Sequence, residues 1–258
     1  MTGRSGSVAA SEPRELLNRS TLEVAAALLG WRLVRDDATG RRVGRIVELE
    51  AYVGEEDRAS HARFGPTARN GVMYGPPGRA YVYLVYGMHD CLNIVTGPPG
   101  SPAALLVRAV EPLEGIELMR AARARRAGER RRSGAGDPVG TPRPAGRRSP
   151  PELRIAAGPG LVCAAFDLDR SLTGHDLFDR AAAVRLEPPP EGEPDPLVTT
   201  GPRVGIGYAG APWTAVPWRF AIAGNGAVSR PPLGGPATEP RNRTDASEPS
   251  ARTDPIAG

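Results

Sequence analysis

The chain reads V-E-L-E-A-Y at residues 47–52, and the rest of the sequence is organised around this stretch. Apolar residues at the odd positions alternate with two glutamates and a tyrosine, as in a strand whose successive side chains point to opposite faces. Glu50 and Tyr52 should therefore share one face of a strand. A carboxylate beside an aromatic ring suits a general base, although Glu50 taken singly also fits a solvent-facing or salt-bridged glutamate.

A second stretch, Y-V-Y-L-V-Y-G-M-H-D-C-L-N at residues 81–93, predicts a hairpin. Tyr81 and Tyr83 alternate with apolar residues and should share a face, where they also fit ordinary cross-strand packing. Tyr86 breaks the alternation immediately before Gly87, a residue that can end a strand in a turn. We therefore expect Tyr86 near an exposed hairpin tip.

The flanking sequence predicts a mixture of helices and antiparallel strands. Ser20 and Glu23 form a capping box ahead of an apolar run that Gly30 ends, which predicts a first helix. Further helices should open at Pro112, ending near residue 128, and span 158–166, where the glycine-rich start fits either an anion site or an ordinary helix start. We expect strands at 31–35, 47–52, 81–86, 91–96, 103–110, 183–188, 204–208 and 218–223.

The length of 258 residues and the 40% hydrophobic content fit one globular domain. We assign this domain to residues 13–228. Residues 1–12 and the proline-rich stretch 229–258 should be disordered, because they carry too little apolar material for a core. The arginine- and proline-rich insertion at 128–152 should be mobile.

The composition excludes several classes of protein. All 33 basic residues are arginine, so a lysine Schiff base, a phosphate-loop lysine and the usual pyridoxal-phosphate enzyme are excluded. Cys91, Cys163 and the three histidines lack metal-ligand spacing, so we expect no metal and no cofactor. The chain has neither a secretory apolar segment nor an apolar run of about 18 residues, so we expect a soluble, cytoplasmic protein without membrane contact.

The positive charge is concentrated in one segment. Residues 120–148 contain ten arginines against Glu129 and Asp137, a net charge of +8, so the rest of the chain sums to −4 within the total of +4. Such a block can follow the phosphates of a nucleic acid, and it can equally be solvated surface or loop.

Several motifs follow one another in a fixed order: E-A-Y-x-G-x-x-D-x-x-S-H-A-R with T-x-R-N (50–70), Y-V-Y-x-x-Y-G-M-x-x-C-x-N (81–93), L-V-R-A-V-E-P-L-E-G (106–115), G-P-G-L-V-C-A-A-F (158–166) and R-V-G-I-G-Y-A-G (203–210). Together they resemble the 3-methyladenine DNA glycosylases of the alkyladenine (AAG/MPG-like) type, over about residues 15–223. The resemblance implies an α+β fold. It would be a single mixed domain with a curved, mostly antiparallel sheet flanked by helices, without the helix-hairpin-helix of other glycosylases.

The resemblance also implies an activity. The protein would act as a monomer on double-stranded DNA that contains damaged purines, and would associate with the nucleoid when bound. It would flip out an alkylated or deaminated purine nucleotide and hydrolyse its N-glycosidic bond. By position, Glu50 would activate the water, and Arg108 and the backbone carbonyl of Val204 would help to hold it.

The remaining site residues are carried over in the same way. Tyr52, His61 and Tyr83 would bracket the flipped base, and Asn93 would crowd the 2-amino group of normal guanine. Tyr86 would fill the gap that the flipped nucleotide leaves in the base stack, which agrees with its predicted place at a hairpin tip.

Two other functions stay open. A non-catalytic binder of damaged DNA or of RNA would keep the aromatic residues and the arginine block, but it would not need Glu50. A glycosidase of free nucleosides would have no use for Tyr86. The absence of lysine further predicts a monofunctional enzyme, because a glycosylase that also cleaves the strand normally uses a lysine amine.

Overall fold

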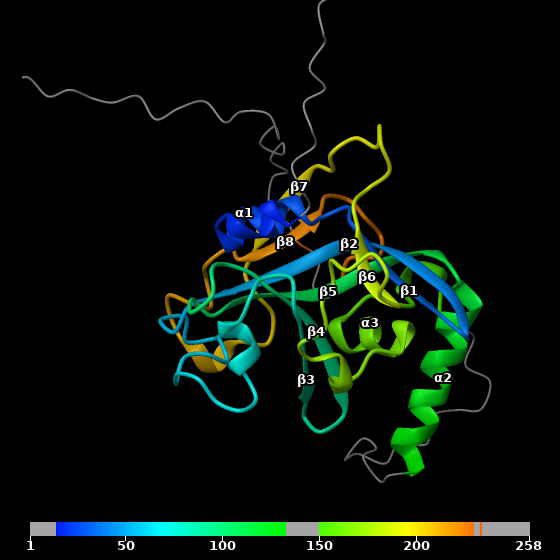
Figure 1. Cartoon of the computed structure of the whole chain (residues 1–258), viewed down its shortest axis with the longest axis horizontal. Helices are drawn as coiled ribbons and strands as arrows, with labels where there is room; N and C mark the ends of the chain where they lie inside the picture. The colour runs from blue at the N-terminus through cyan, green and yellow to red at the C-terminus, as the bar shows by residue number, and fades with distance from the viewer. Residues whose placement is uncertain (1–13, 133–149, 230–232, 234–258) are drawn as a thin grey trace, which may run out of the picture.

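The computed structural model describes residues 14–132, 150–229 and 233. The predicted disordered end at 1–12, most of the insertion at 128–152 and nearly all of the tail at 229–258 therefore lie outside the described residues. Within the described part, the predicted α+β fold with an antiparallel sheet is confirmed (Figure 1).

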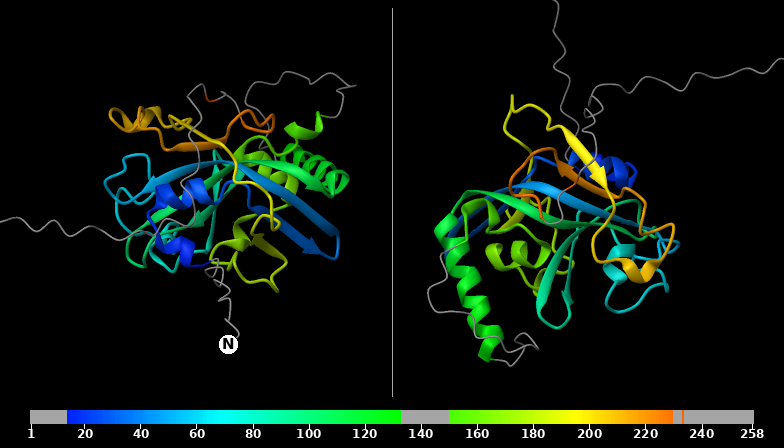
Figure 2. Two further views of the ribbon diagram at one scale, coloured as in Figure 1. Left: turned by 90° about the horizontal axis from the view of Figure 1, so that it is seen from above. Right: turned by 180° about the vertical axis from the view of Figure 1, so that it is seen from behind.

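Among the described residues, one sheet of eight strands forms the centre of the structure. Its strands pair in the order β3-β4-β5-β2-β1-β6, with β8 joining β2 and β7 joining β8. Every pairing is antiparallel, and the sheet curls, as Figure 2 shows. The strands are β1 (Arg32–Asp37), β2 (Gly40–Val53), β3 (Ala80–Val85), β4 (His89–Val95), β5 (Ala103–Glu114), β6 (Val184–Glu187), β7 (Val198–Gly201) and β8 (Arg219–Ile222).

Strand β2, which carries Glu50, lies in the middle of this sheet. It pairs with β5 along one edge, and with β1 and then β8 along the other. The register between β2 and β5 shifts on both sides of Glu48, which leaves Val47 and Arg108 without a direct partner across this ladder. Such bulges twist a sheet and re-aim side chains, and they occur often beside active sites.

In the described part of the chain, three α-helices pack around the sheet: α1 (Thr21–Ala27), α2 (Ile116–Arg132) and α3 (Pro159–Phe166). Ser20 and Glu23 form the predicted capping box of α1, which lies above β2 in Figure 1, while α3 lies below the sheet. Short 3-10 turns lie at Glu15–Asn18, Gly71–Tyr74, Glu152–Arg154, Arg170–Leu172 and Gly207–Ala209. The main core combines Leu49 and Ala51 of β2 with residues of both α1 and α3.

Two predicted boundaries were wrong. The helix expected at Pro112 begins at Ile116, because Pro112 still belongs to β5 and pairs with Gly44 at a register shift, a place that tolerates proline. Gly115, at φ +73°, then turns the chain, and a Cβ there would lie 2.2 Å from the carbonyl oxygen of Arg41. Helix α2 also continues beyond residue 128 to Arg132.

The strand predicted at 204–208 does not form either. This segment is a bend followed by the 3-10 turn at Gly207–Ala209, and Gly205 has a φ of +78° that a strand does not contain. The strand lies earlier, as β7, and pairs with β8. The segment that follows β7 is therefore free to turn towards Glu50.

Candidate active site

Glu50 lies at the meeting point of three segments and has no exposed surface. The phenolic O–H of Tyr52 donates to its Oε2 at 2.9 Å, and the backbone N–H of Val204 donates to its Oε1 at 2.7 Å. The Nη1 of Arg108 lies 3.3 Å from the same Oε1. The alternation in β2 thus places Glu50 and Tyr52 on one face, as predicted, and Arg108 and Val204 come to them from residues far along the chain.

Burial raises the pKa of Glu50 above its ordinary value. The charge of Arg108, the N–H of Val204 and the hydroxyl of Tyr52 oppose this rise, and the charge of Glu48 adds to it. A carboxylate with a raised pKa that still has partners for its ionised form can take up a proton and release it. Glu50 therefore has the electrostatic surroundings of a general base.

An aromatic group stands next to this carboxylate. The ring of His61 meets that of Tyr83 edge-on, with centroids 4.4 Å apart, and the rings of Tyr81 and Tyr83 are 5.5 Å apart. The Nδ1 of His61 lies 2.9 Å from the hydroxyl oxygen of Tyr81. The side-chain amide of Asn70 donates to the carbonyl of His61 at 2.8 Å and holds this part of the loop.

His61 lies at the rim of this group, and part of its side chain is exposed. Desolvation of its inner edge, together with the charges of Arg69 and Arg63, lowers the pKa of His61 below its ordinary value. The imidazole is therefore neutral at pH 7 and can stack on a base or form a hydrogen bond with it without carrying charge.

The strand register puts two predicted site residues, Glu50 and Asn93, in one row across the sheet. Glu50 lies opposite Leu106, Leu106 opposite Asn93, and Asn93 opposite Tyr81, so these side chains share a face. Asn93 is buried and donates through its side-chain amide to the carbonyls of Tyr81 at 3.0 Å and Cys91 at 3.3 Å. Its position is therefore fixed.

Tyr86 occupies the tip of the β3–β4 hairpin, as predicted, and its side chain is 84% exposed. Tyr86 and Gly87 both have positive φ, at 51° and 68°, and form the centre of a tight turn in which the N–H of Met88 donates to the carbonyl of Val85 at 2.9 Å. A tyrosine in this left-handed conformation costs about 1–2 kcal/mol. The fold thus holds a large aromatic ring in solvent at an unfavourable backbone conformation.

Sequence reasoning missed a buried ion pair behind Tyr52. Arg203 and Asp57 have no exposed side-chain surface and form two hydrogen bonds, at 2.6 and 2.9 Å. The guanidinium of Arg203 also lies over the rings of Tyr52 and Trp218, at 4.8 and 5.0 Å from their centroids. Asp57 and Arg203 both occur in the motifs quoted above, but no spacing rule connects residues 146 positions apart.

Sequence reasoning also missed Glu48. This glutamate is fully buried and bonds Arg108 at 2.8 Å and Arg219 at 2.7 Å. Its two arginine partners lie 60 and 171 residues further along the chain. The V-E-L-E alternation, which puts Glu48 and Glu50 on one face, was the available signal.

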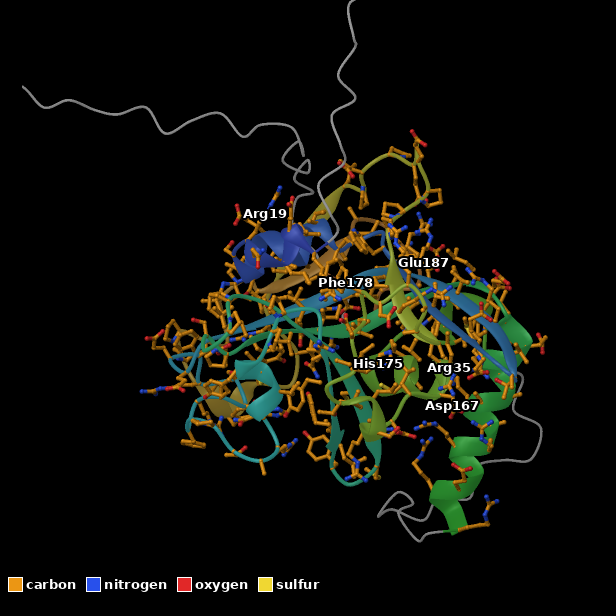
Figure 3. All side chains as sticks on the ribbon, viewed as in Figure 1. Arg19, Arg35, Asp167, His175, Phe178 and Glu187 are labelled. Atoms are coloured by element: carbon orange, nitrogen blue, oxygen red, sulfur yellow. The ribbon has the colours of Figure 1, made fainter. Side chains whose placement is uncertain are left out.

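Part of the arginine block is paired within the protein. Arg126 bonds Asp167 at 2.8 Å and Asp90 at 3.2 Å, and Arg125 bonds Asp167 at 2.5 Å. Asp167 ends α3 and lies beside Arg35 in Figure 3. These pairs tie α2 to α3 and to the start of β4, just after the hairpin turn, so the helical half of the block contributes to holding the hairpin that carries Tyr86.

Other parts of the described chain offer less. A hollow of about 450 Å³ borders Arg32, Arg45 and Glu193, but both arginines pair with Glu193 and no predicted site residue lines it. Among the described residues, no group of three or more His, Cys, Asp or Glu side chains could hold a metal ion. No helix in the same part of the chain is long and apolar enough to cross a membrane.

Comparison with known proteins identifies the family of the chain. The chain matches the family model described as methylpurine-DNA glycosylase (MPG) over residues 15–226. A relative from Anaeromyxobacter dehalogenans strain 2CP-1 is 45% identical over 231 residues, which cover 87% of this chain and 88% of the relative. Relatives from Methanocella arvoryzae and Myxococcus xanthus are 43% and 40% identical, over 84% and 85% of this chain and 95% and 94% of their own. All three carry the provisional name 3-methyladenine DNA glycosylase.

Proposed function

Because the chain belongs to the methylpurine-DNA glycosylase family, and is therefore a DNA-3-methyladenine glycosylase of base excision repair, we propose that Glu50 directs its chemistry. A water molecule activated by Glu50 hydrolyses the N-glycosidic bond of an alkylated purine, such as 3-methyladenine or 7-methylguanine, or of a deaminated purine. The observation that supports this most directly is the buried carboxylate with a raised pKa, bonded to Tyr52 and Val204 beside the tyrosines of β3.

The substrate base must first leave the DNA stack. Extrusion costs a few kcal/mol, and least for a damaged base, while each stack of a base on an aromatic ring returns about 1–3 kcal/mol. Tyr52, His61 and Tyr83 bracket the extruded base and offset this cost. Tyr86 enters from the minor groove and fills the gap that the nucleotide leaves.

Bond cleavage then creates positive charge on the sugar. The N-glycosidic bond breaks towards an oxocarbenium-like state, and its electron pair leaves with the purine. Water adds to the anomeric carbon and gives its proton to Glu50, whose carboxylate also stabilises the developing charge. Arg108 and the backbone carbonyl of Val204 help to hold that water, while the N–H of Val204 orients the carboxylate.

Selectivity follows from the lining of the site. A purine alkylated at N3 or N7 carries positive charge, which the faces of Tyr52 and Tyr83 attract. The same charge makes the purine a good leaving group. Asn93, fixed by its bonds to two backbone carbonyls, crowds the 2-amino group of guanine and disfavours this normal base.

The absence of lysine from the sequence favours a monofunctional reaction that leaves an intact abasic site. We further propose that the enzyme works as a monomer in the cytoplasm, on the DNA of the nucleoid. A β-elimination product that appears with the purified protein, under conditions where abasic DNA survives alone, would contradict the monofunctional assignment.

The decisive experiment measures release of the free base from duplexes that each carry one 3-methyladenine, 7-methylguanine, hypoxanthine or ethenoadenine. Glu50→Gln should reduce release by about 10²- to 10⁴-fold and keep binding to the damaged duplex. Glu111→Gln is the matched control, since Glu111 pairs with Arg45 at 2.7 Å across the same two strands. Release by Glu50→Gln at the parental rate would refute the assignment, and binding without release by the parental protein would favour a non-catalytic binder.

A further inference from the structure

A second carboxylate, Glu48, lies buried two residues before Glu50, and the reaction described above does not use it. Its Oε1 accepts from the Nε of Arg108 at 2.8 Å, the Nε of Arg219 at 2.7 Å and the hydroxyl of Ser229 at 2.8 Å. Its Oε2 accepts from the backbone N–H of Ser229 at 2.6 Å. Four donors from three segments thus converge on one side chain.

Arg108 is shared between the two carboxylates. Its Nε bonds Glu48, its Nη2 donates to the hydroxyl of Ser229 at 3.1 Å, and its Nη1 faces Glu50 at 3.3 Å. A guanidinium is planar and rigid, so fixing Nε and Nη2 also fixes the direction of Nη1. The contact of Arg108 with Glu50 is therefore set by Glu48 and Ser229.

The charges of this buried cluster balance. Glu48 and Glu50 face Arg108 and Arg219, two negative groups against two positive ones. Without the charge of Glu48, Glu50 would be the remaining carboxylate of the cluster, and Arg108 would be drawn fully to it. A carboxylate held tightly by a guanidinium is a weaker base.

We propose that Glu48 is a positioning residue of the glycosylase reaction, which holds Arg108, with the help of Ser229 and Arg219, where it leaves Glu50 basic. This inference rests on the proposed role of Glu50 as the base. The backbone supports it, since the register shifts on both sides of Glu48 take Arg108 out of the regular β2–β5 ladder and let it reach both carboxylates.

The effects of Glu48 and Arg108 on the pKa of Glu50 have the signs that this proposal requires. Burial is the largest cause of the raised pKa of Glu50, and the charge of Glu48 raises it further while Arg108 lowers it. Loss of the charge at position 48 should therefore move the acid side of the pH–rate profile to lower pH. A purely structural role of Glu48 would change stability and leave this profile in place.

The test is Glu48→Gln in the full chain. Glutamine removes the charge and keeps an acceptor for the three donors at Oε1. It loses the hydrogen bond from the N–H of Ser229, because its amide nitrogen is itself a donor. We expect the single-turnover rate of base release, with enzyme in excess, to fall on the order of 10- to 100-fold, with little change in the Kd for the damaged duplex. The acid side of the pH–rate profile should shift to lower pH.

Two further variants keep the test decisive if Glu48→Gln fails to fold. Ser229→Ala removes the hydroxyl that joins Glu48 to Arg108 and keeps both charges, so the rate should fall while the acid side of the profile stays in place. Glu48→Asp keeps the charge and should recover the parental profile in part. Glu111→Gln should leave both rate and profile unchanged.

A parental rate and profile in both Glu48→Gln and Ser229→Ala would overturn the inference. An equal loss of rate in Glu111→Gln would also overturn it, because the effect would then follow from losing any ion pair of this sheet. Failure of the parental protein to release any of the four bases would instead refute the proposed function.

Discussion

The buried ion pair of Asp57 and Arg203 allows the magnitude of a loss of stability to be predicted. In Asp57→Asn the side chain keeps its shape but loses its charge, so the guanidinium of Arg203 stays buried without a counterion. Both side chains have 0% exposure, and removing one partner of such a pair costs about 3–5 kcal/mol of unfolding free energy. For a domain of this size that loss corresponds to a fall in Tm of about 6–20 °C.

The matched control is Asp36→Asn. Asp36 bonds Arg41 at 3.0 Å, but the two side chains are 46% and 36% exposed, so this pair contributes at most about 1 kcal/mol. Thermal unfolding followed by circular dichroism, with urea unfolding as a second measure, separates the two variants. An equal fall in Tm for both, or an unchanged Tm in Asp57→Asn, would refute the reasoning from burial. Base release should also decrease in Asp57→Asn, since the pair holds the residue before Val204 and the ring of Tyr52.

Three further predictions concern the base, the hairpin and its support. The folded pKa of Glu50 is raised above its unfolded value, so the folded state binds more protons than the unfolded state between these values, and stability falls as pH rises through that range. The difference in Tm between Glu50→Gln and the parental protein should therefore favour the variant more at pH 8 than at pH 4. A difference that does not change with pH would contradict the raised pKa. Tyr86→Asn, which tolerates the left-handed backbone, should weaken binding to a damaged duplex by about 5- to 150-fold in fluorescence anisotropy, because one stack is lost; unchanged affinity would remove Tyr86 from the DNA contact. Gly160→Ala would place a Cβ 2.9 Å from the Cβ of His89, the residue that follows the hairpin turn. Urea unfolding should show a loss of about 1–3 kcal/mol, and unchanged stability would mean that α3 and β4 move apart at little cost.

The sequence predicted those parts of the fold that local patterns determine. Alternation placed Glu50 and Tyr52 on one face of β2, and the glycine at 87 placed Tyr86 at a tip, because both effects act over a few residues. The start of α2 was misplaced because Pro112 fits a helix start equally well, and only its pairing with Gly44 keeps it in a strand. The residues next to Pro112 in the sequence do not indicate that pairing.

The support of the site could not be predicted for the same reason. Glu48 and Asp57 look like ordinary surface carboxylates in the sequence, and each is buried only because an arginine far along the chain arrives beside it. The direction from which Val204 approaches Glu50 also depends on a turn that the sequence pattern reads as a strand. The order of the motifs identified the candidate site residues. The contacts between distant segments of the folded chain explain how these residues are positioned.

Ser229 stands 181 residues after Glu48, at the far end of the domain. A polypeptide still emerging from the ribosome thus contains Glu50 and every tyrosine of β3 well before it contains the serine that completes the network around Arg108. A chain released before residue 229 would therefore hold Glu48 and Arg108 without the serine that bonds to both of them.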